Sequence, residues 1–262
     1  MKIVVTVKLV PDTNADKRID PGTKRLVRTG VETVLNPFDE YAIEAALQLK
    51  EKSGADSTVT VVAMAPEAGK EVVRKALAMG ADDAVMLSDA GCEGSDVYGT
   101  AYALAAAIKK TGFDLVVCGT QSTDATTGEL PGALAEFLGV PGLTNVRKFE
   151  VDGTSLKAER ETDDGFLRVT ASLPLLVSVT KSINEPRYPS LKGIMGAKKK
   201  TIAMLTLADL ALDRPIGTDG AKTELVALAE PAVRGKGRVV QAADGADGAR
   251  LIVEFLREKK LV

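Results

Sequence analysis

The sequence predicts an α/β fold in which a parallel sheet is covered by helices, continues into an antiparallel extension and ends in a C-terminal arm. Short apolar runs alternate with longer amphipathic stretches over residues 2–138. This alternation is typical of β-α-β units and therefore of a parallel sheet with helices on both faces. After residue 138 the strand-like runs follow one another without helices between them, which indicates antiparallel pairing.

Four apolar runs are the predicted parallel strands: residues 2–7, 57–63, 84–87 and 114–119. Amphipathic stretches with helical spacing lie between and after them, at residues 38–52, 67–79, 95–110 and 127–138. Asn36 and Pro37 precede the first helix as a cap and a first-turn proline. Gly80 and Gly112 stand where the second and third helices are expected to stop.

The extension is predicted to contain strands at residues 143–151, 154–160, 167–172 and 175–180. Asp152-Gly153 and Asp163-Asp164-Gly165 are turn signals, so the first three of these strands are expected to form hairpins.

The chain beyond residue 200 is predicted to hold a short helix at 207–211, a Gly/Ala/Asp-rich linker near 242–248 and a final helix at 249–259. The apolar residues of the final helix share one face: Leu251, Ile252, Phe255 and Leu256. Two interpretations remain open. The helix packs on its own domain, or it is an arm that grips another chain across a flexible linker. The basic, Gly-rich run 234–238 carries no aromatic residue for base stacking and is interpreted as a linker or a subunit contact.

Composition narrows the classes of function. The 262 residues are 45% hydrophobic and 27% charged, which fits a globular chain with a large core. The 34 Lys and Arg residues against 36 Asp and Glu residues leave a net charge of −2, so no global charge favours nucleic acid or a membrane surface. The apolar runs are far shorter than the ~20 residues of a membrane-spanning helix, and the first residues do not read as a signal peptide. We therefore expect a cytoplasmic protein without membrane insertion.

The sequence contains no histidine, which excludes Ser-His-Asp and Cys-His catalysis and imidazole metal sites. Cys92 and Cys118 lack metal-ligand spacing and are expected to be free thiols, so no metal site is predicted. The chain also lacks both a Gly-x-x-x-x-Gly-Lys phosphate loop and a Gly-x-Gly-x-x-Gly turn after its strands. A hydrolase or ligase is the least favoured class, whereas a carrier of a redox cofactor needs no histidine.

A loop rich in small hydroxyl residues follows the strand at 114–119 and leads into a helix. It reads Gly119-Thr120-Gln121-Ser122-Thr123-Asp124-Ala125-Thr126-Thr127-Gly128-Glu129. Ligands of parallel sheets bind at the carboxyl ends of strands, and a helix N-terminus attracts phosphate. The loop is therefore either an anion site or an ordinary structural connection, because such clusters also form caps and turns.

A second unusual segment is residues 184–200. Two prolines near its start disfavour a regular helix there, while Leu191, Ile194 and Met195 are spaced to share one face of a helical turn. Apolar side chains rimmed by Arg187, Lys192 and the run Lys198-Lys199-Lys200 suit a docking surface, with anchors for affinity and charge for steering. The alternative is a loop whose leucine folds back into its own core.

Several segments of the chain resemble the small (beta) subunit of electron transfer flavoproteins, and they follow one another in the same order as in that family. They are residues 184–200, residues 158–165 with Leu173-Pro174 and Val177-Ser178-Val179, and the N-terminal segments 7–13, 36–40 and 76–82. The resemblance implies a Rossmann-like fold of the adenine-nucleotide-binding type. It implies a nucleotide-binding domain over residues 1–200, which includes a partner-recognition loop at 184–200, and a C-terminal linker and arm over 201–262.

The resemblance also implies the site residues. A structural AMP is expected at Thr6, Asn36, Pro37, Phe38, Asp39, Met64, Ser122, Thr123, Asp124, Ala125, Thr126, Thr127, Gly128 and Glu129. A second FAD is the alternative ligand of that pocket. Glu161 is expected near the redox FAD, which the alpha subunit mainly holds, and Tyr188, Leu191, Ile194 and Met195 are expected at the partner surface, with Leu191 as the anchor.

The function implied is that of an electron carrier and not an enzyme. Its implied partners are an alpha subunit, flavin-dependent dehydrogenases such as acyl-CoA dehydrogenases, and a membrane-linked quinone reductase as acceptor. The alternative is an adenine-nucleotide-binding stress or signalling module of the same fold without a redox role.

Overall fold

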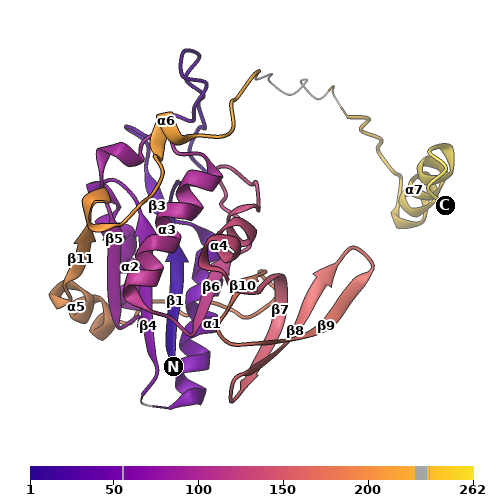
Figure 1. Cartoon of the computed structure of the whole chain (residues 1–262). Coiled ribbons are helices and arrows are strands. Elements are labelled where there is room, and N and C mark those ends of the chain that lie inside the picture. Colours follow the sequence, from indigo (N-terminus) through magenta and orange to yellow (C-terminus); the bar gives the residue numbers. More distant parts are fainter. Residues whose placement is uncertain (55, 228–234, 236) are drawn as a thin grey trace. The chain divides into compact units, whose positions relative to one another are not determined.

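The computed structural model describes residues 1–54, 56–227, 235 and 237–262, and it divides into two compact units (Figure 1). The first unit runs from Met1 to Leu225 and the second from Val226 to Val262. The first unit therefore extends past residue 200, where the sequence analysis expects the linker and arm to begin. Within the described residues, no helix is both long and apolar enough to cross a bilayer.

The first unit is built on a nine-stranded sheet with the order β11-β5-β4-β1-β6-β10-β7-β8-β9. The predicted parallel strands are confirmed as β1 (Lys2–Val7), β4 (Thr58–Met64), β5 (Asp83–Leu87) and β6 (Leu115–Gly119). All neighbours among them are parallel; for example, Val5 of β1 lies between Val61 of β4 and Val117 of β6. These three valines are fully buried, as expected of strands covered on both faces.

Helices cover both faces of the parallel sheet. On one face, α1 (Pro37–Ser53) and α2 (Lys70–Met79) pack in the cluster that contains Val5. On the other face, α3 (Val97–Thr111) and α4 (Leu130–Leu138) pack in the cluster that contains Val4. Neighbouring residues of β1 thus enter opposite halves of the core, because successive side chains of a strand point to opposite faces.

Three predicted helices begin later than expected, and the smallest shift is that of α3, which begins at Val97 instead of residue 95. The stretch expected to be helical from residue 67 starts with a 3₁₀ turn, Glu67–Gly69, before α2 begins. The helix expected from residue 127 begins as α4 at Leu130, since Thr126 and Gly128 both have positive φ angles, 53° and 66°, which no helix accepts. The loop that carries the hydroxyl residues is correspondingly longer.

The antiparallel extension consists of β7 (Gly142–Asp152), β8 (Ser155–Thr162) and β9 (Gly165–Ser172), joined by the two predicted turns. The prediction was wrong for the fourth strand, β10 (Leu175–Val179). It does not belong to the antiparallel extension, because it pairs in parallel with both β6 and β7. All five of its residues are buried. An unbroken apolar run is the pattern of a central parallel strand. The absence of a helix before this run nevertheless favoured antiparallel pairing in the prediction.

The remaining short elements were either not predicted or differ from the prediction. Strand β11 (Ile202–Leu205) pairs in parallel with β5 at the sheet edge, and the helix expected at 207–211 is only a 3₁₀ turn, Leu207–Asp209. Strands β2 (Leu9–Pro11) and β3 (Thr33–Leu35) form a small antiparallel ribbon, and α6 (Gly217–Gly220) is a single turn.

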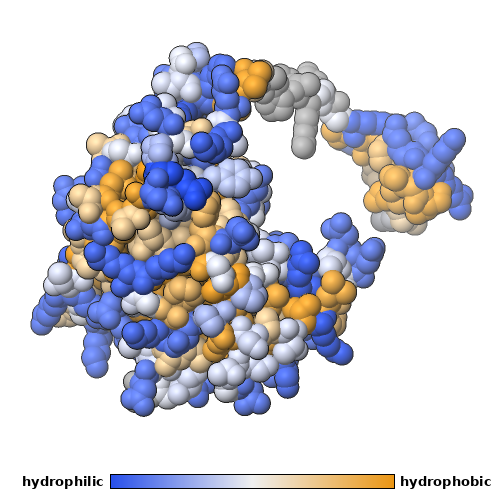
Figure 2. Space-filling model, in the orientation of Figure 1, coloured by the Kyte–Doolittle hydropathy of each residue, from blue (hydrophilic) through white to orange (hydrophobic). Residues whose placement is uncertain are grey.

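The second unit contains α7 (Gly245–Glu258), which confirms the final helix and begins it earlier than predicted. Asp244 caps it by accepting a hydrogen bond from the Asp247 amide. None of its residues is buried, and Figure 2 shows its apolar residues gathered on one side of the helix. Within the basic run 234–238, Arg234 and Lys236 lie outside the described residues.

Candidate functional site

The strand order changes direction at β1, which makes the carboxyl ends of β1 and β6 the candidate ligand-binding edge. The chain builds β4 and β5 on one side of β1 and then continues with β6 on the other side. Ligands of open parallel sheets bind at such a switch point, outside the carboxyl ends of the strands. The loop after β6 lies there, as the sequence analysis predicts.

Asn36 ties the start of α1 to this loop. It occupies the N-cap position and Pro37 the first turn, as predicted, but the Asn36 side chain makes no capping bond to its own helix. Its Nδ2 donates to Asp39 Oδ1 and to the Gln121 carbonyl, both at 2.9 Å, and its Oδ1 accepts from the Thr123 amide at 3.2 Å. A buried amide thus joins two segments that are far apart in the sequence.

Gly119, at the end of β6, allows this close approach. A Cβ atom on Gly119 would lie 2.5 Å from Asp39 Oδ1 and 2.8 Å from the Phe38 carbonyl carbon. Atoms cannot approach so closely, so α1 could not start where it does if any other residue followed Cys118. The close backbone approach expected at Gly119 is made by Phe38.

Asp39 is a buried carboxyl group at this edge. Its Oδ2 accepts from the Lys8 amide at 2.8 Å, and its Oδ1 is the partner of Asn36. Burial raises the pKa of Asp39 from 3.8 to about 7, although the hydrogen bonds from Asn36 and Lys8 oppose the rise. Thr6, also buried, contacts Cys118, and burial raises the pKa of that thiol to about 12, so Cys118 stays protonated.

We expect Asp39→Asn to flatten the pH dependence of stability between about pH 4 and 7. The folded chain binds the Asp39 proton up to about pH 7 and the unfolded chain only up to 3.8. The contribution of Asp39 to the free energy of unfolding therefore falls as the pH rises through this window. Urea unfolding at several pH values should show a smaller decline in the variant than in the wild type, with Glu40→Gln as the control. An unchanged pH profile in Asp39→Asn would disprove the assignment.

Asp124 is the centre of an ion-pair cluster on the same loop. Its side chain is buried, and its two oxygens lie 2.8 Å from Lys8 Nζ and 2.5 Å from Arg28 Nη2. Burial alone would raise the pKa of Asp124, but the charge of Lys8 and the hydrogen bonds from Lys8, Ser122 and Arg28 hold it far below its ordinary value. Two cations against one ionised carboxylate leave a net positive charge beside the loop.

The donors at this edge fit a phosphorylated ligand with hydroxyl groups. The Thr123 hydroxyl is buried and has no hydrogen-bond partner, which a polar group of a ligand would supply. The positive Lys8, Arg28 and Asp124 cluster suits an anion. Lys17 adds a further cation, whose Nζ donates to the Thr123 carbonyl at 3.1 Å.

The remaining predicted pocket residues are placed differently. Met64 is the last residue of β4, at the same edge of the sheet, and is half-buried. Phe38 is the second residue of α1 and lies against Gly119. The outer part of the loop is exposed: Ala125, Thr126, Thr127, Gly128 and Glu129.

Glu161 is not part of this edge. It lies on β8 opposite Phe166 of β9, with β7 and β10 between β8 and β6. The Arg147 guanidinium stacks 4.5 Å from the centre of the Phe166 ring and pairs with Glu159 at 3.3 Å. The extension therefore presents a charged and aromatic surface around Glu161 that the sequence analysis did not predict.

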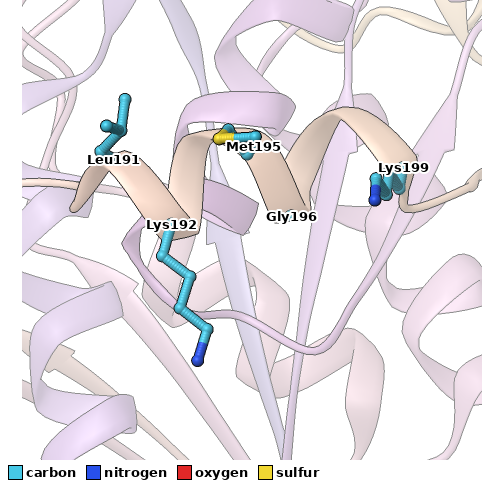
Figure 3. Close-up of a pocket in the computed structure, with 5 residues that line it drawn as sticks. All are labelled: Leu191, Lys192, Met195, Gly196 and Lys199. Atoms are coloured by element: carbon cyan, nitrogen blue, oxygen red, sulfur yellow. The ribbon is translucent and has the colours of Figure 1, made fainter.

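The predicted partner surface consists of helix α5 (Leu191–Lys199) and the segment before it, which contains Tyr188. Tyr188 is 95% exposed, Leu191 76%, Met195 59% and Ile194 42%. Leu191 and Met195 project from one side of α5, and with Lys192, Gly196 and Lys199 they line a shallow hollow (Figure 3). Leu191 does not fold back into its own core, which removes the alternative interpretation of this segment.

One part of the predicted cationic rim is corrected. Lys192, Lys198 and Lys199 are exposed, but Arg187 is bound to Glu44 and Glu51 of α1, and Lys200 Nζ donates to the Ala81 carbonyl at 2.6 Å. Arg187 and Lys200 therefore hold the segment to its own domain and are not available to steer a partner.

Comparison with known proteins identifies the family. Residues 23–210 match the model of the electron transfer flavoprotein domain. The beta subunit of electron transfer flavoprotein from Mycobacterium tuberculosis is 42% identical, over 99% of both chains. The chain belongs to the electron transfer flavoprotein family. A beta subunit from Megasphaera elsdenii is 40% identical over 99% of this chain and 97% of its own. Subunit CarD of a caffeyl-CoA reductase-Etf complex from Acetobacterium woodii is 35% identical over the whole of both chains.

Membership in the electron transfer flavoprotein family confirms the resemblance and the predicted function of a beta subunit in electron transfer. It does not favour the stress or signalling module. The match includes the loop after β6 and helix α5, whereas Thr6, Lys8 and Lys17 of the first candidate site precede the matched residues.

Three residues of the candidate site were not predicted from the sequence: Lys8, Lys17 and Arg28. Lys8 follows the central strand directly, so its position at the carboxyl edge could have been inferred from the strand prediction. Lys17 and Arg28 belong to the long connection between β2 and β3, which no sequence pattern directs toward the loop after β6.

Proposed function

We propose that the chain pairs with an alpha subunit, that the pair carries electrons on an FAD held mainly by that subunit, and that α5 docks on flavin-dependent dehydrogenases such as acyl-CoA dehydrogenases. The observation that carries the proposal is the set of exposed apolar side chains on an ordered helix of a family domain. A membrane-linked quinone reductase is the proposed acceptor. The name of the Acetobacterium relative assigns it to a complex with a reductase, which supports an enzyme partner here as well.

AMP is the proposed ligand of the loop after β6. Asn36, Asp39 and the Thr123 amide would frame the pocket, the unpaired Thr123 hydroxyl would bind a polar group, and the positive cluster around Asp124 would favour the phosphate. The chain offers no histidine for proton transfer there, so a structural role is proposed for the nucleotide. A second FAD is the alternative ligand of the same pocket.

The bound flavin would supply the electron-transfer chemistry, and this chain would supply its surroundings. Glu161, half-exposed on β8, is proposed to lie at the interface near the flavin, where its carboxylate would affect the local potential or pair with a cation of the alpha subunit. The chain itself is proposed to be a carrier subunit and not an enzyme.

The second unit is proposed to be an arm that binds the alpha subunit. Residues Ile252, Val253 and Phe255 of α7 are exposed within their own unit. An amphipathic helix with an uncovered apolar face suits a groove on a partner. The second unit is therefore proposed to contribute, together with the first unit, to pairing with the alpha subunit.

Co-expression with a flavin-binding alpha subunit tests the proposed function. The expected product is a yellow heterodimer that releases AMP on denaturation, as identified by mass spectrometry. Deletion of residues 237–262 should reduce the amount of alpha subunit that co-purifies. A colourless complex with both subunits present would contradict the proposal, as would a stable homodimer of this chain that exchanges ATP without a flavoprotein partner. If the pocket of this chain releases FAD and not AMP, the alternative ligand is the correct one.

A further inference from the structure

The segment before α5 is attached to α1 by a dense set of charged hydrogen bonds. Arg187 Nε and Nη2 donate to the two oxygens of Glu44 at 2.7 and 3.0 Å. Arg187 Nη1 and Nη2 donate to the two oxygens of Glu51 at 2.6 and 3.2 Å. The Arg187 amide adds a bond to Glu44 at 3.2 Å. A planar guanidinium can satisfy two carboxylates in this way, whereas a lysine ammonium cannot.

Glu44 makes this attachment strong because it is buried. Its side chain is only 5% exposed, while that of Glu51 is 58% exposed. Burial alone would raise the pKa of Glu44, but hydrogen bonds from Arg187 and Gln48 hold it below its ordinary value. A buried carboxylate needs a partner of this kind, so Arg187 is fixed in place by the core of its own domain.

The rest of α5 is fixed on α2. The Ser190 side chain caps α5 by accepting from the Gly193 amide at 3.0 Å. At the other end, Arg74 of α2 donates to the Ala197 and Lys200 carbonyls at 2.6 and 2.9 Å. Between them, Gly193 lies so close to α2 that a Cβ atom there would be 2.3 Å from the Ala78 carbonyl oxygen.

These contacts tie the segment to α1 and α2, whereas the apolar side chains of Leu191 and Met195 are exposed. Arg187 is one residue before Tyr188 and four before Leu191, so its clamp controls where the chain enters the exposed helix. A rigid docking element binds better than a mobile one, because less conformational entropy is lost on binding.

We propose that Arg187 is a positioning residue for partner docking: its clamp on Glu44 and Glu51 pre-orders the segment that presents Leu191. The inference rests on the proposed docking function of α5. It assigns Arg187 no contact with the partner. Its loss therefore weakens docking without altering the flavin or its environment.

The test uses the heterodimer and an acyl-CoA dehydrogenase that reduces it. We expect Arg187→Met to raise the KM for the heterodimer about 5- to 10-fold with little change in kcat, since only the ordering cost of docking increases. Arg187→Lys should restore part of the affinity. Reduction of the flavin by dithionite should be unchanged, and amide hydrogen exchange over residues 188–196 should be faster in Arg187→Met. Lys70→Met, which removes a cation paired with Glu67 at the start of α2, is the matched control.

A double variant separates positioning from damage to the fold. Arg187→Met leaves the buried Glu44 unpaired, and Arg187→Met with Glu44→Gln removes that unpaired charge. A raised KM in the folded double variant supports positioning, and a wild-type KM in it overturns the proposal. A wild-type KM and wild-type exchange in Arg187→Met overturn it as well. If Leu191→Ala raises the KM in the same assay, such a failure concerns only Arg187, whereas an unaffected Leu191→Ala would remove the docking function itself.

Discussion

Leu191→Ala is expected to lower the kcat/KM for reduction of the heterodimer by its dehydrogenase about 30-fold. This corresponds to about 2 kcal/mol, the loss typical of an apolar anchor that becomes fully buried in a partner pocket. The side chain is 76% exposed and lies next to Met195 on the exposed side of α5, so its truncation should not disturb the core of its own domain. Stopped-flow measurement of flavin reduction gives the rate directly.

Ile19→Ala is the control for Leu191→Ala, because Ile19 is also a large exposed apolar residue, at 47%, but lies between β2 and β3. Its truncation should leave the rate unchanged. Equal rates for wild type and Leu191→Ala would show that α5 does not anchor the donor.

Gly119→Ala is expected to destabilise the chain by about 3 kcal/mol, the cost typical of a severe overlap in a packed region. The new Cβ would overlap with Asp39 Oδ1 and with the Phe38 carbonyl carbon, and the latter is backbone that cannot rotate away. Relief requires α1 to shift from β6, which would separate Asn36 from Gln121 and Thr123. Chemical unfolding should show the loss of stability, and mass spectrometry should show less bound nucleotide.

Gly132→Ala is the matched control for Gly119→Ala. Gly132 lies in α4, and a Cβ atom there would meet nothing within 4 Å, so alanine should be neutral or should stabilise the helix by up to about 1 kcal/mol. A Gly119→Ala variant with wild-type stability and wild-type nucleotide content would refute the role assigned to Gly119.

The parallel half of the fold could be predicted because its signal is local. Each of the strands β1, β4, β5 and β6 is a short apolar run, and the helices α1, α2 and α3 separate these runs in the sequence. The pairing of β10 was not predictable from the same evidence, because the partner of a strand depends on contacts far away in the sequence. The edge strand β11 was not predicted for a different reason. Only Ile202 of its four residues is buried, so burial is weak there.

The candidate site was partly predictable for similar reasons. The resemblance assigned Asn36, Asp39 and the loop after β6, and the sheet topology brings these residues to one edge. The bonds that hold them together could not be read from the sequence. Asn36 was predicted as a helix cap, yet its side chain bonds to Gln121 and Thr123, more than eighty residues later.

Arg187 shows the same limit on the other surface. Its place in the same segment as Lys192 and the run Lys198-Lys199-Lys200 suggested a role in steering, but the fold brings Glu44 and Glu51 of α1 beside it. Whether a surface cation is free or paired depends on tertiary contacts, which a run of like charges in the sequence does not reveal.

Hydrogen-exchange mass spectrometry of the heterodimer, with and without the dehydrogenase that reduces it, tests the docking of α5 most directly. If α5 is the docking element, the dehydrogenase slows exchange of the amides between Tyr188 and Lys199, and Leu191→Ala abolishes this protection at the same concentrations. Protection elsewhere on the heterodimer, with unchanged exchange in α5, would contradict this role.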